Sequence, residues 1–198
     1  MYQIRVHGRG GQGVVTAAEL IAIAAIYDGR YAQAFPSFGS ERTGAPVEAY
    51  CRIDDAPIRS HEPVDSPDTV LVLDATLLGR PGLFQGLRPY GLVLVNSPGE
   101  VRNPAALNLR TVPATRLALE RTGRPLPNAP MLGAFAAASG AVGIEAVRAA
   151  ISLRFPGKLA KANVRGADDA YAYMQQDEAA VLDLPTALVI AGETEHVN

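Results

Sequence analysis

The segment Gly8-Arg9-Gly10-Gly11-Gln12-Gly13 decides the fold, because it separates two stretches of different hydrophobic periodicity. The preceding stretch, Tyr2 to His7, reads as an apolar β-strand, and the following stretch, Val14 to Tyr27, has the pattern of a long helix. The first, third and sixth residues of the segment satisfy G-x-G-x-x-G directly after a strand and directly before a helix, the context in which this motif is informative. The sequence therefore predicts an α/β domain that begins with a strand, a glycine turn and a helix.

The rest of the chain continues this alternation. Tyr31 to Phe35 is expected to complete a βαβ unit, and the whole fits a Rossmann-like, open and mostly parallel sheet with flanking helices and an irregular C-terminal tail. We expect one α/β domain over residues 1–175 and a tail over residues 176–198. Further strands are expected at Val47–Ile53, Thr69–Asp74, Gly91–Asn96 and Leu107–Val112. Helices are expected at Ala114–Arg121, Pro130–Ser139, Ile144–Phe155 and Gly166–Met174, and a short, glycine-broken helix at Leu77–Leu87.

Composition excludes several classes of function. The chain has 198 residues, 48% of them hydrophobic. Its net charge is -2, so it has no positive electrostatic field that would attract nucleic acid. No apolar run approaches the ~18 residues of a membrane span, and the N-terminus lacks the pattern of a secretory signal, so we expect a cytoplasmic protein. Its one cysteine and three scattered histidines predict no metal site and no iron–sulfur cluster in this chain.

The glycine turn is suited to a phosphate. Glycines allow a tight turn and a close approach of the backbone, which leaves the first N–H groups of the following helix free for an anion. Arg9 adds a positive charge beside them. The alternative is a turn whose glycines only let the strand and the helix pack together.

Two familiar nucleotide sites do not fit. A dinucleotide site of the Rossmann type needs an Asp or Glu at the end of the second strand, and that strand ends Ala34-Phe35-Pro36-Ser37. A Walker A site needs Lys followed by Ser or Thr after the glycines, and neither is present. Both absences argue against NAD and against a P-loop nucleotide.

The loop from Pro36 to Pro46 leaves the carboxyl end of the second strand and should lie beside the start of the first helix. Ser40 and Arg42 are candidates for contacts with a phosphate or carboxylate, and Phe38 offers a stacking face. The alternative is that Glu41 and Arg42 form a surface ion pair of little energetic consequence.

A catalytic set is missing. Cys51 lies on the apolar face of the expected strand Val47 to Ile53 and should be an inert core residue. Asp74 ends a strand, where a functional carboxylate is common, but capping of the next turn explains it equally well. His61 lies in a charged loop and is expected at the surface.

The first helix is apolar nearly all round, with Thr16 and Glu19 as its interior polar residues. Such a helix needs cover on more than its sheet-facing side. Another subunit is a candidate for that cover.

Three segments together resemble the gamma subunit of pyruvate and related 2-oxoacid:ferredoxin oxidoreductases. They are Gly8–Gly13, Phe35–Val47 and Asn128-Ala129-Pro130-Met131-Leu132-Gly133, in the order and spacing of that family, and the likeness covers residues 2–175. Thr43 departs from the family, which usually has a second arginine or a glycine there.

The resemblance implies a subunit of an enzyme that oxidatively decarboxylates a 2-oxo acid and joins the acyl group to coenzyme A. It implies companion alpha, beta and ferredoxin-like delta subunits, which carry thiamine diphosphate, Mg and [4Fe-4S] clusters, and a ferredoxin or flavoprotein acceptor. This chain would be non-catalytic and would contact coenzyme A. The resemblance carries that contact to Gly8, Arg9, Gly10, Gly11, Gln12, Gly13, Ser40, Glu41, Arg42 and Thr43.

Two other functions remain open at this stage: a stand-alone nucleotide-binding oxidoreductase, and a purely structural assembly subunit whose turn binds nothing. The substrate is open as well. Pyruvate is the default, with 2-oxoglutarate, branched-chain 2-oxo acids and phenylglyoxylate as alternatives, because the decarboxylation pocket should belong to other subunits.

Overall fold

The computed structural model describes residues 1–37, 44–60, 62–103 and 107–182. Five residues of the loop after the second strand, Phe38, Ser40, Glu41, Arg42 and Thr43, lie outside the described residues, as does His61. The expectations placed on them stay predictions.

The described residues form a six-stranded sheet in the order β2-β3-β1-β4-β5-β6. Neighbours β1, β4, β5 and β6 pair in parallel, whereas β3 pairs antiparallel with both β1 and β2. Five strands therefore share one direction and β3 opposes them, which confirms the expected mostly parallel α/β sheet. The strands are β1 (Tyr2–Arg9), β2 (Tyr31–Pro36), β3 (Pro46–Asp54), β4 (Thr69–Val72), β5 (Leu92–Asn96) and β6 (Asn108–Val112).

The first unit is not a simple βαβ unit, because β3 lies between β1 and β2. Strands β2 and β3 form an antiparallel pair, with Tyr31 opposite Asp54, and β3 then continues along β1 with Tyr2 opposite Ile53. The predicted βαβ unit is therefore present, since β2 runs parallel to β1 and is joined to it through α1, but β3 separates its two strands. The side of β1 that β2 would occupy is taken by β3, whose apolar residues Ala49, Cys51 and Ile53 are fully buried against the helices, as the alternation predicts.

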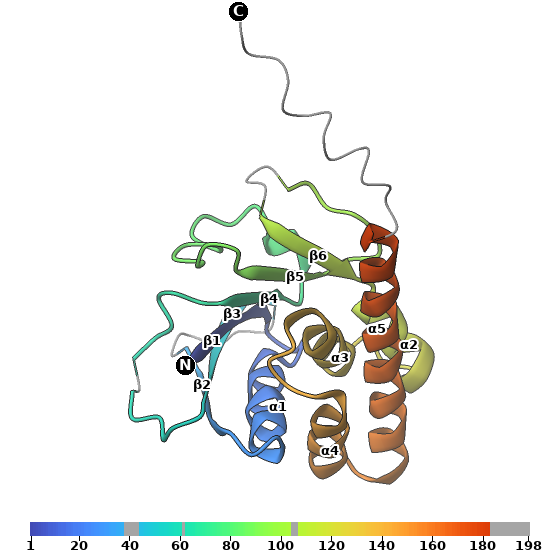
Figure 1. Cartoon of the computed structure of the whole chain (residues 1–198). Helices are drawn as coiled ribbons and strands as arrows, with labels where there is room; N and C mark the ends of the chain where they lie inside the picture. Colours follow the sequence, from blue (N-terminus) through green and yellow to red (C-terminus); the bar gives the residue numbers. More distant parts are fainter. Residues whose placement is uncertain (38–43, 61, 104–106, 183–198) are drawn as a thin grey trace, which may run out of the picture.

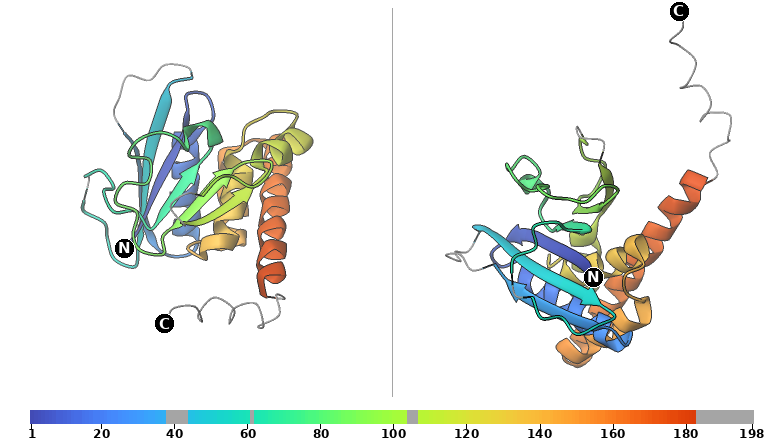
Figure 2. Two further views of the ribbon diagram at one scale, coloured as in Figure 1. Left: turned by 90° about the horizontal axis from the view of Figure 1, so that it is seen from above. Right: turned by 60° about the vertical axis from the view of Figure 1, so that its left-hand side comes forward.

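The helices gather on one side of the sheet (Figure 1). They are α1 (Val14–Tyr27), α2 (Ala114–Thr122), α3 (Asn128–Ser139), α4 (Ile144–Arg154) and α5 (Gly157–Leu182). The larger core cluster joins them to the sheet residues that face them, including Ile4 and Val6 of β1 and Leu71 of β4. Figure 2 shows the same separation of sheet and helices from two other directions.

The opposite face of β4 and β5 has a smaller core of its own. Val70, Val72, Val93 and Val95 pack there beneath Leu77 and Leu83. A helix was predicted over residues 77–87, and that prediction was wrong: the segment has one 3-10 turn at Ala75–Leu77 and then a series of turns.

Glycine explains why that segment is not helical. Gly82 and Gly86 both have positive φ, which helix residues do not adopt. A Cβ on Gly86 would lie 1.8 Å from the carbonyl oxygen of Asp65, so the chain is pressed against a neighbouring loop at this point. The leucines of this segment therefore pack on the sheet from a series of turns and not from a helix.

Cover for α1 comes from the same chain. The helix packs on β2 and β3 with one side and on α4 and α3 with others. Its residues are mostly buried, and the large exposed ones, Ile26 and Tyr27, lie at its last turn. Contacts within this chain therefore explain the apolar sequence of α1, and cover by another subunit is not required.

Close packing of α3 against α5 depends on Gly133. A Cβ at this position would lie 1.9 Å from the carbonyl oxygen of Ala167 in α5, a distance no side chain tolerates. Helix α5 is longer than the segment Gly166–Met174 predicted from its pattern, since it runs from Gly157 to Leu182. Among the residues that the structure describes, no helix has the length and apolar character that crossing a membrane requires.

Candidate functional site at the carboxyl edge of the sheet

The glycine turn joins the end of β1 to the start of α1, and different structural constraints require glycine at its different positions. Gly11 and Gly13 have φ of 94° and 78°, in the left-handed region that favours glycine. Gly8 has no room for a side chain, because a Cβ there would lie 2.6 Å from Cγ2 of Val14. A Cβ on Gly13 would lie 2.7 Å from Nδ2 of Asn128, so the start of α3 is pressed against the turn.

Helix α1 begins without a side-chain cap. Gly13 precedes its first residue, and the first helical hydrogen bond runs from the N–H of Ala17 to the Gly13 carbonyl at 2.9 Å. The N–H groups of Val14, Val15 and Thr16 are consequently not used by the helix. Together with the positive end of the helix dipole, they provide donors for an anion.

The turn is held from two sides. On one side, the N–H of Gly10 donates to the carbonyl of Ala45 at 2.9 Å, and the N–H of Gly44 donates to the carbonyl of Gly10 at 3.3 Å. Within the turn, Oε1 of Gln12 accepts a hydrogen bond from the N–H of Arg9 at 2.7 Å. The turn is therefore fixed in shape by its own chain.

Asp74 holds the other side. Its Oδ2 accepts hydrogen bonds from Nε of Arg9 at 3.1 Å and from Nε2 of Gln12 at 2.9 Å. Its Oδ1 accepts from the N–H of Thr76 at 3.0 Å and from the Thr76 hydroxyl at 2.6 Å, so Asp74 caps the 3-10 turn that follows β4. The interpretation of Asp74 as a capping residue is confirmed, and its carboxylate also links β4 to the glycine turn.

Burial raises the pKa of the Asp74 carboxyl, but hydrogen bonds from Thr76 and Gln12 and the charge of Arg9 outweigh it and leave the pKa below its usual value. Asp74 is therefore ionised at neutral pH. The guanidinium of Arg9 is also engaged by the carbonyl of Gly44 at 3.2 Å and by the Thr76 hydroxyl at 2.7 Å. Arg9 thus supports the shape of the turn as well as bringing charge to it.

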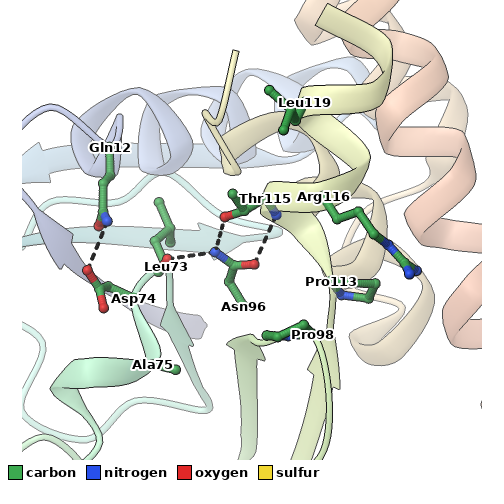
Figure 3. A pocket seen from close by; sticks show the side chains of 10 residues that line it. All are labelled: Gln12, Leu73, Asp74, Ala75, Asn96, Pro98, Pro113, Thr115, Arg116 and Leu119. Carbon is green, nitrogen blue, oxygen red and sulfur yellow. Dashed lines mark hydrogen bonds between the residues drawn. The ribbon is translucent and has the colours of Figure 1, made fainter. Parts of the chain in front are cut away.

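Two cavities flank the turn. The smaller, of about 300 Å³, exposes the start of α1 and is lined by Arg9, Gly10, Gly11, Gly13, Val14, Val15, Thr16 and Val47. The larger, of about 460 Å³, lies beyond the carboxyl ends of β4 and β5 and is shown in Figure 3. Gln12 points into the larger cavity while its neighbours Gly11 and Gly13 line the smaller one, so a single turn serves both.

Asn96, at the end of β5, organises the larger cavity. Its Nδ2 donates to the carbonyl of Leu73 at 2.9 Å and to the hydroxyl of Thr115 at 2.7 Å, and its Oδ1 accepts from the N–H of Thr115 at 3.0 Å (Figure 3). It thereby ties the ends of two parallel strands to the first turn of α2, which has no cap of its own. The carboxyl edge of a parallel sheet, where this cavity lies, is the usual place for ligands in such folds.

The structure thus brings six of the predicted site residues, Gly8 to Gly13, into one turn. Sequence reasoning missed Asn96 and the role of Gln12 as a link to Asp74. It included Asn128 only as part of a motif, without placing it against Gly13. The position of Asn96 at the end of an apolar strand was the signal that could have revealed it.

Cys51 is buried in the core, and burial raises the pKa of its thiol far above the usual value, so it is the inert residue predicted. Across the described ranges, no three His, Cys, Asp or Glu side chains are grouped so as to hold a metal ion.

Residues 3–173 match the family model described as pyruvate ferredoxin/flavodoxin oxidoreductase. The chain is 48% identical over 171 residues to "Pyruvate synthase subunit PorC" of Methanothermobacter thermautotrophicus, covering 86% of this chain and 94% of that protein. It is 49% identical to "Pyruvate/ketoisovalerate oxidoreductases common subunit gamma" of Thermococcus litoralis, covering 86% and 96%. The crystal structure of the pyruvate oxidoreductase subunit PORC from Thermotoga maritima superposes with a TM-score of 0.76 at 40% identity, covering 86% and 95%.

The fold and the match over nearly the whole domain define the class: the chain belongs to the pyruvate ferredoxin/flavodoxin oxidoreductase family. Within that family it is a gamma-type subunit of a pyruvate or related 2-oxoacid oxidoreductase, and such a subunit works in a multi-subunit enzyme. The resemblance inferred from the three motifs is confirmed.

Proposed function

We propose that this subunit binds coenzyme A through the glycine turn and presents it to a reaction whose chemistry is performed by companion subunits. The observation that carries the proposal is the uncapped start of α1, where Val14, Val15 and Thr16, whose N–H groups the helix does not use, line a cavity together with Gly11 and Gly13. Backbone donors at the positive end of a helix suit the diphosphate of such a ligand.

The shape of the site supports this assignment. A diphosphate needs a close approach to the backbone, and Gly11 supplies it, because no atom lies within 4 Å of the position a Cβ would take. The larger cavity beside Gln12 leaves room for a further part of the same molecule. Ser40, Glu41, Arg42 and Thr43 remain proposed contacts, since Gly44, which follows them, is hydrogen-bonded to the turn at Gly10.

The stand-alone dinucleotide-binding oxidoreductase is less well supported. In a site of the Rossmann type, the second strand lies beside the first, and an acidic side chain at its end hydrogen-bonds to the ribose. Here β3 separates β2 from β1, and β2 ends in Phe35 and Pro36. An acid at the end of β2 would therefore be displaced by one strand from its usual position.

One observation favours the purely structural alternative. The guanidinium of Arg9 is already hydrogen-bonded to Asp74, Gly44 and Thr76, so it is not free to take a phosphate without exchanging partners. The backbone donors of α1 carry the proposal instead. Iron–sulfur clusters are proposed for companion subunits, because one buried cysteine cannot ligate a cluster. Thiamine diphosphate is proposed to bind to companion subunits as well.

The chain offers a matched pair of variants to test the proposal. Gly11 and Gly29 both have positive φ, and both have open space where a Cβ would lie, but Gly29 follows the far end of α1. Gly11→Asp places a carboxylate in the turn cavity, whereas Gly29→Asp introduces the same charge and backbone strain away from it. Calorimetric titration of the assembled enzyme with coenzyme A should show affinity at least about 10-fold weaker for Gly11→Asp, because like charges repel at close range, and unchanged for Gly29→Asp.

Fragments of the ligand locate the contact. Dephospho-coenzyme A keeps the diphosphate and should lose affinity with Gly11→Asp as coenzyme A does. Pantetheine has no diphosphate and should bind both variants alike. Equal affinity of wild type and Gly11→Asp for coenzyme A would rule out the turn as its site.

A further inference from the structure

Several positively charged side chains line a groove between α2 and α5. It has a volume of about 350 Å³ and is lined by Glu120, Arg121, Lys158, Lys161, Ala162 and Arg165. The two lysines are the only lysines in the sequence, and they lie one helical turn apart on α5 in a chain whose net charge is -2. None of these residues lines either cavity beside the glycine turn.

Acidic residues neutralise only part of this charge. Arg121 forms two hydrogen bonds to the Asp169 carboxylate, at 2.6 Å and 3.1 Å. Lys158, Lys161 and Arg165 have no ion pair within the part of the chain that the structure describes.

Several arginines elsewhere on the surface are paired with acidic residues. Arg88 lies 3.0 Å from Asp68, and Arg30 lies 2.9 Å from Asp55. The α2–α5 groove differs from these paired sites because three of its cations, close together on one helix, have no ion pair among the described residues.

The arrangement is unfavourable in the isolated chain. Lys161 lies three positions after Lys158, and Arg165 lies four positions after Lys161, so like charges adjoin along one face of α5. The lysines also lie in the first turns of α5, at the positive end of its dipole, where no acidic residue is present to compensate. An acidic surface placed over the groove would remove all of these repulsions at once.

We propose that the α2–α5 groove is a docking surface for a carboxylate-rich face of a companion subunit of the same enzyme. The argument is charge complementarity: three unpaired cations project from one rigid helix beside a fourth on α2, and the small side chain of Ala162 leaves the groove open between them. A family of multi-subunit enzymes provides such a partner, which explains why the cations are left without an ion pair among the described residues.

The test uses the complete enzyme, with all subunits expressed together. Lys161→Glu reverses one charge in the groove, and Arg102→Glu reverses one exposed charge in a loop that does not line it. Native mass spectrometry over a dilution series measures how readily this subunit leaves the complex. At low ionic strength we expect about a 10-fold weaker association for Lys161→Glu and no change for Arg102→Glu. The difference should shrink in 0.5 M salt, because screening there confines charge interactions to a few ångströms.

Two controls keep the result decisive. Thermal unfolding of the isolated chain should show Lys161→Glu at least as stable as wild type, since the substitution relieves repulsion on α5. Lys161→Gln should weaken association by an intermediate amount. Association equal to wild type at low salt, with the variant folded, overturns the proposal. So does a variant that assembles normally but binds coenzyme A less tightly, because the groove would then be a site for a small anion.

Discussion

The side-chain amide of Gln12 donates a hydrogen bond of 2.9 Å to the carboxylate of Asp74, across 62 residues of sequence. Gln12 belongs to the glycine turn and Asp74 follows β4, so this contact fixes the turn relative to the neighbouring parallel strand. The carboxylate side chain is 15% exposed and accepts from three residues. The proposed ligand site therefore depends on an acid that holds the glycine turn in place.

Asp74→Asn should lower the free energy of unfolding by about 1–3 kcal/mol, because it removes a charge-assisted partner of Arg9 and one acceptor from a network that is half-buried. Urea unfolding followed by circular dichroism measures this. Asp55→Asn is the matched control: Asp55 pairs with Arg30 at 2.9 Å, but its side chain is 86% exposed, so the loss should stay under about 0.5 kcal/mol. Equal losses in the two variants would contradict the structural role assigned to Asp74.

Gly133→Ala should destabilise the fold by at least about 2 kcal/mol, because the added methyl group would force α3 away from α5 at their closest approach. Gly79→Ala adds the same methyl group where no atom lies within 4 Å and where φ is not positive, and should change stability by less than about 0.5 kcal/mol. Thermal unfolding of both variants checks the prediction. A Gly133→Ala protein as stable as wild type would mean that the two helices do not cross as closely as described.

His7 should make stability depend on pH. Its ring is buried, with Nε2 lacking a hydrogen-bond partner, and burial together with the charges of Arg5 and Arg80 lowers its pKa to about 3. Glu48 lies 3.8 Å from Nδ1, too far for a hydrogen bond that would hold a proton on the ring.

The direction in which stability changes with pH follows from proton binding at His7. Between pH 3 and 6.5 the unfolded chain binds a proton at His7 that the folded chain does not, so stability rises with pH across this window. From pH 5 to pH 6 the free energy of unfolding should rise by about 1 kcal/mol more in wild type than in His7→Asn. Parallel pH profiles of the two proteins would show that His7 is not buried in its neutral form.

Much of the fold was predictable from local pattern. The bounds of α1 follow from the glycine turn before Val14 and the Asp28-Gly29 pair after Tyr27, and the apolar face of β3 follows from its alternation. The order of the strands was not predictable in the same way. Nothing in the residues of β2 tells whether it pairs with β1 or with β3, because the pairing depends on contacts with residues distant along the chain.

The site shows the same division. The turn from Gly8 to Gly13 could be identified from sequence because glycine spacing has a local physical cause. The Gln12–Asp74 contact and the Asn96 network could not, since they join residues that are distant along the chain. The segment 77–87 was misassigned because its leucines suggested a helix, whereas Gly82 and Gly86 adopt backbone angles that a helix excludes.

Hydrogen exchange of the assembled enzyme, with and without saturating coenzyme A, tests the central claim most directly. Slow exchange reports amides that are hydrogen-bonded or sequestered. Coenzyme A should slow exchange in the peptide that spans Gly8 to Thr16, while the peptide around Gly29 stays unchanged as an internal reference. An enzyme saturated with coenzyme A in which the Gly8–Thr16 amides exchange at the same rate as without it would contradict the account.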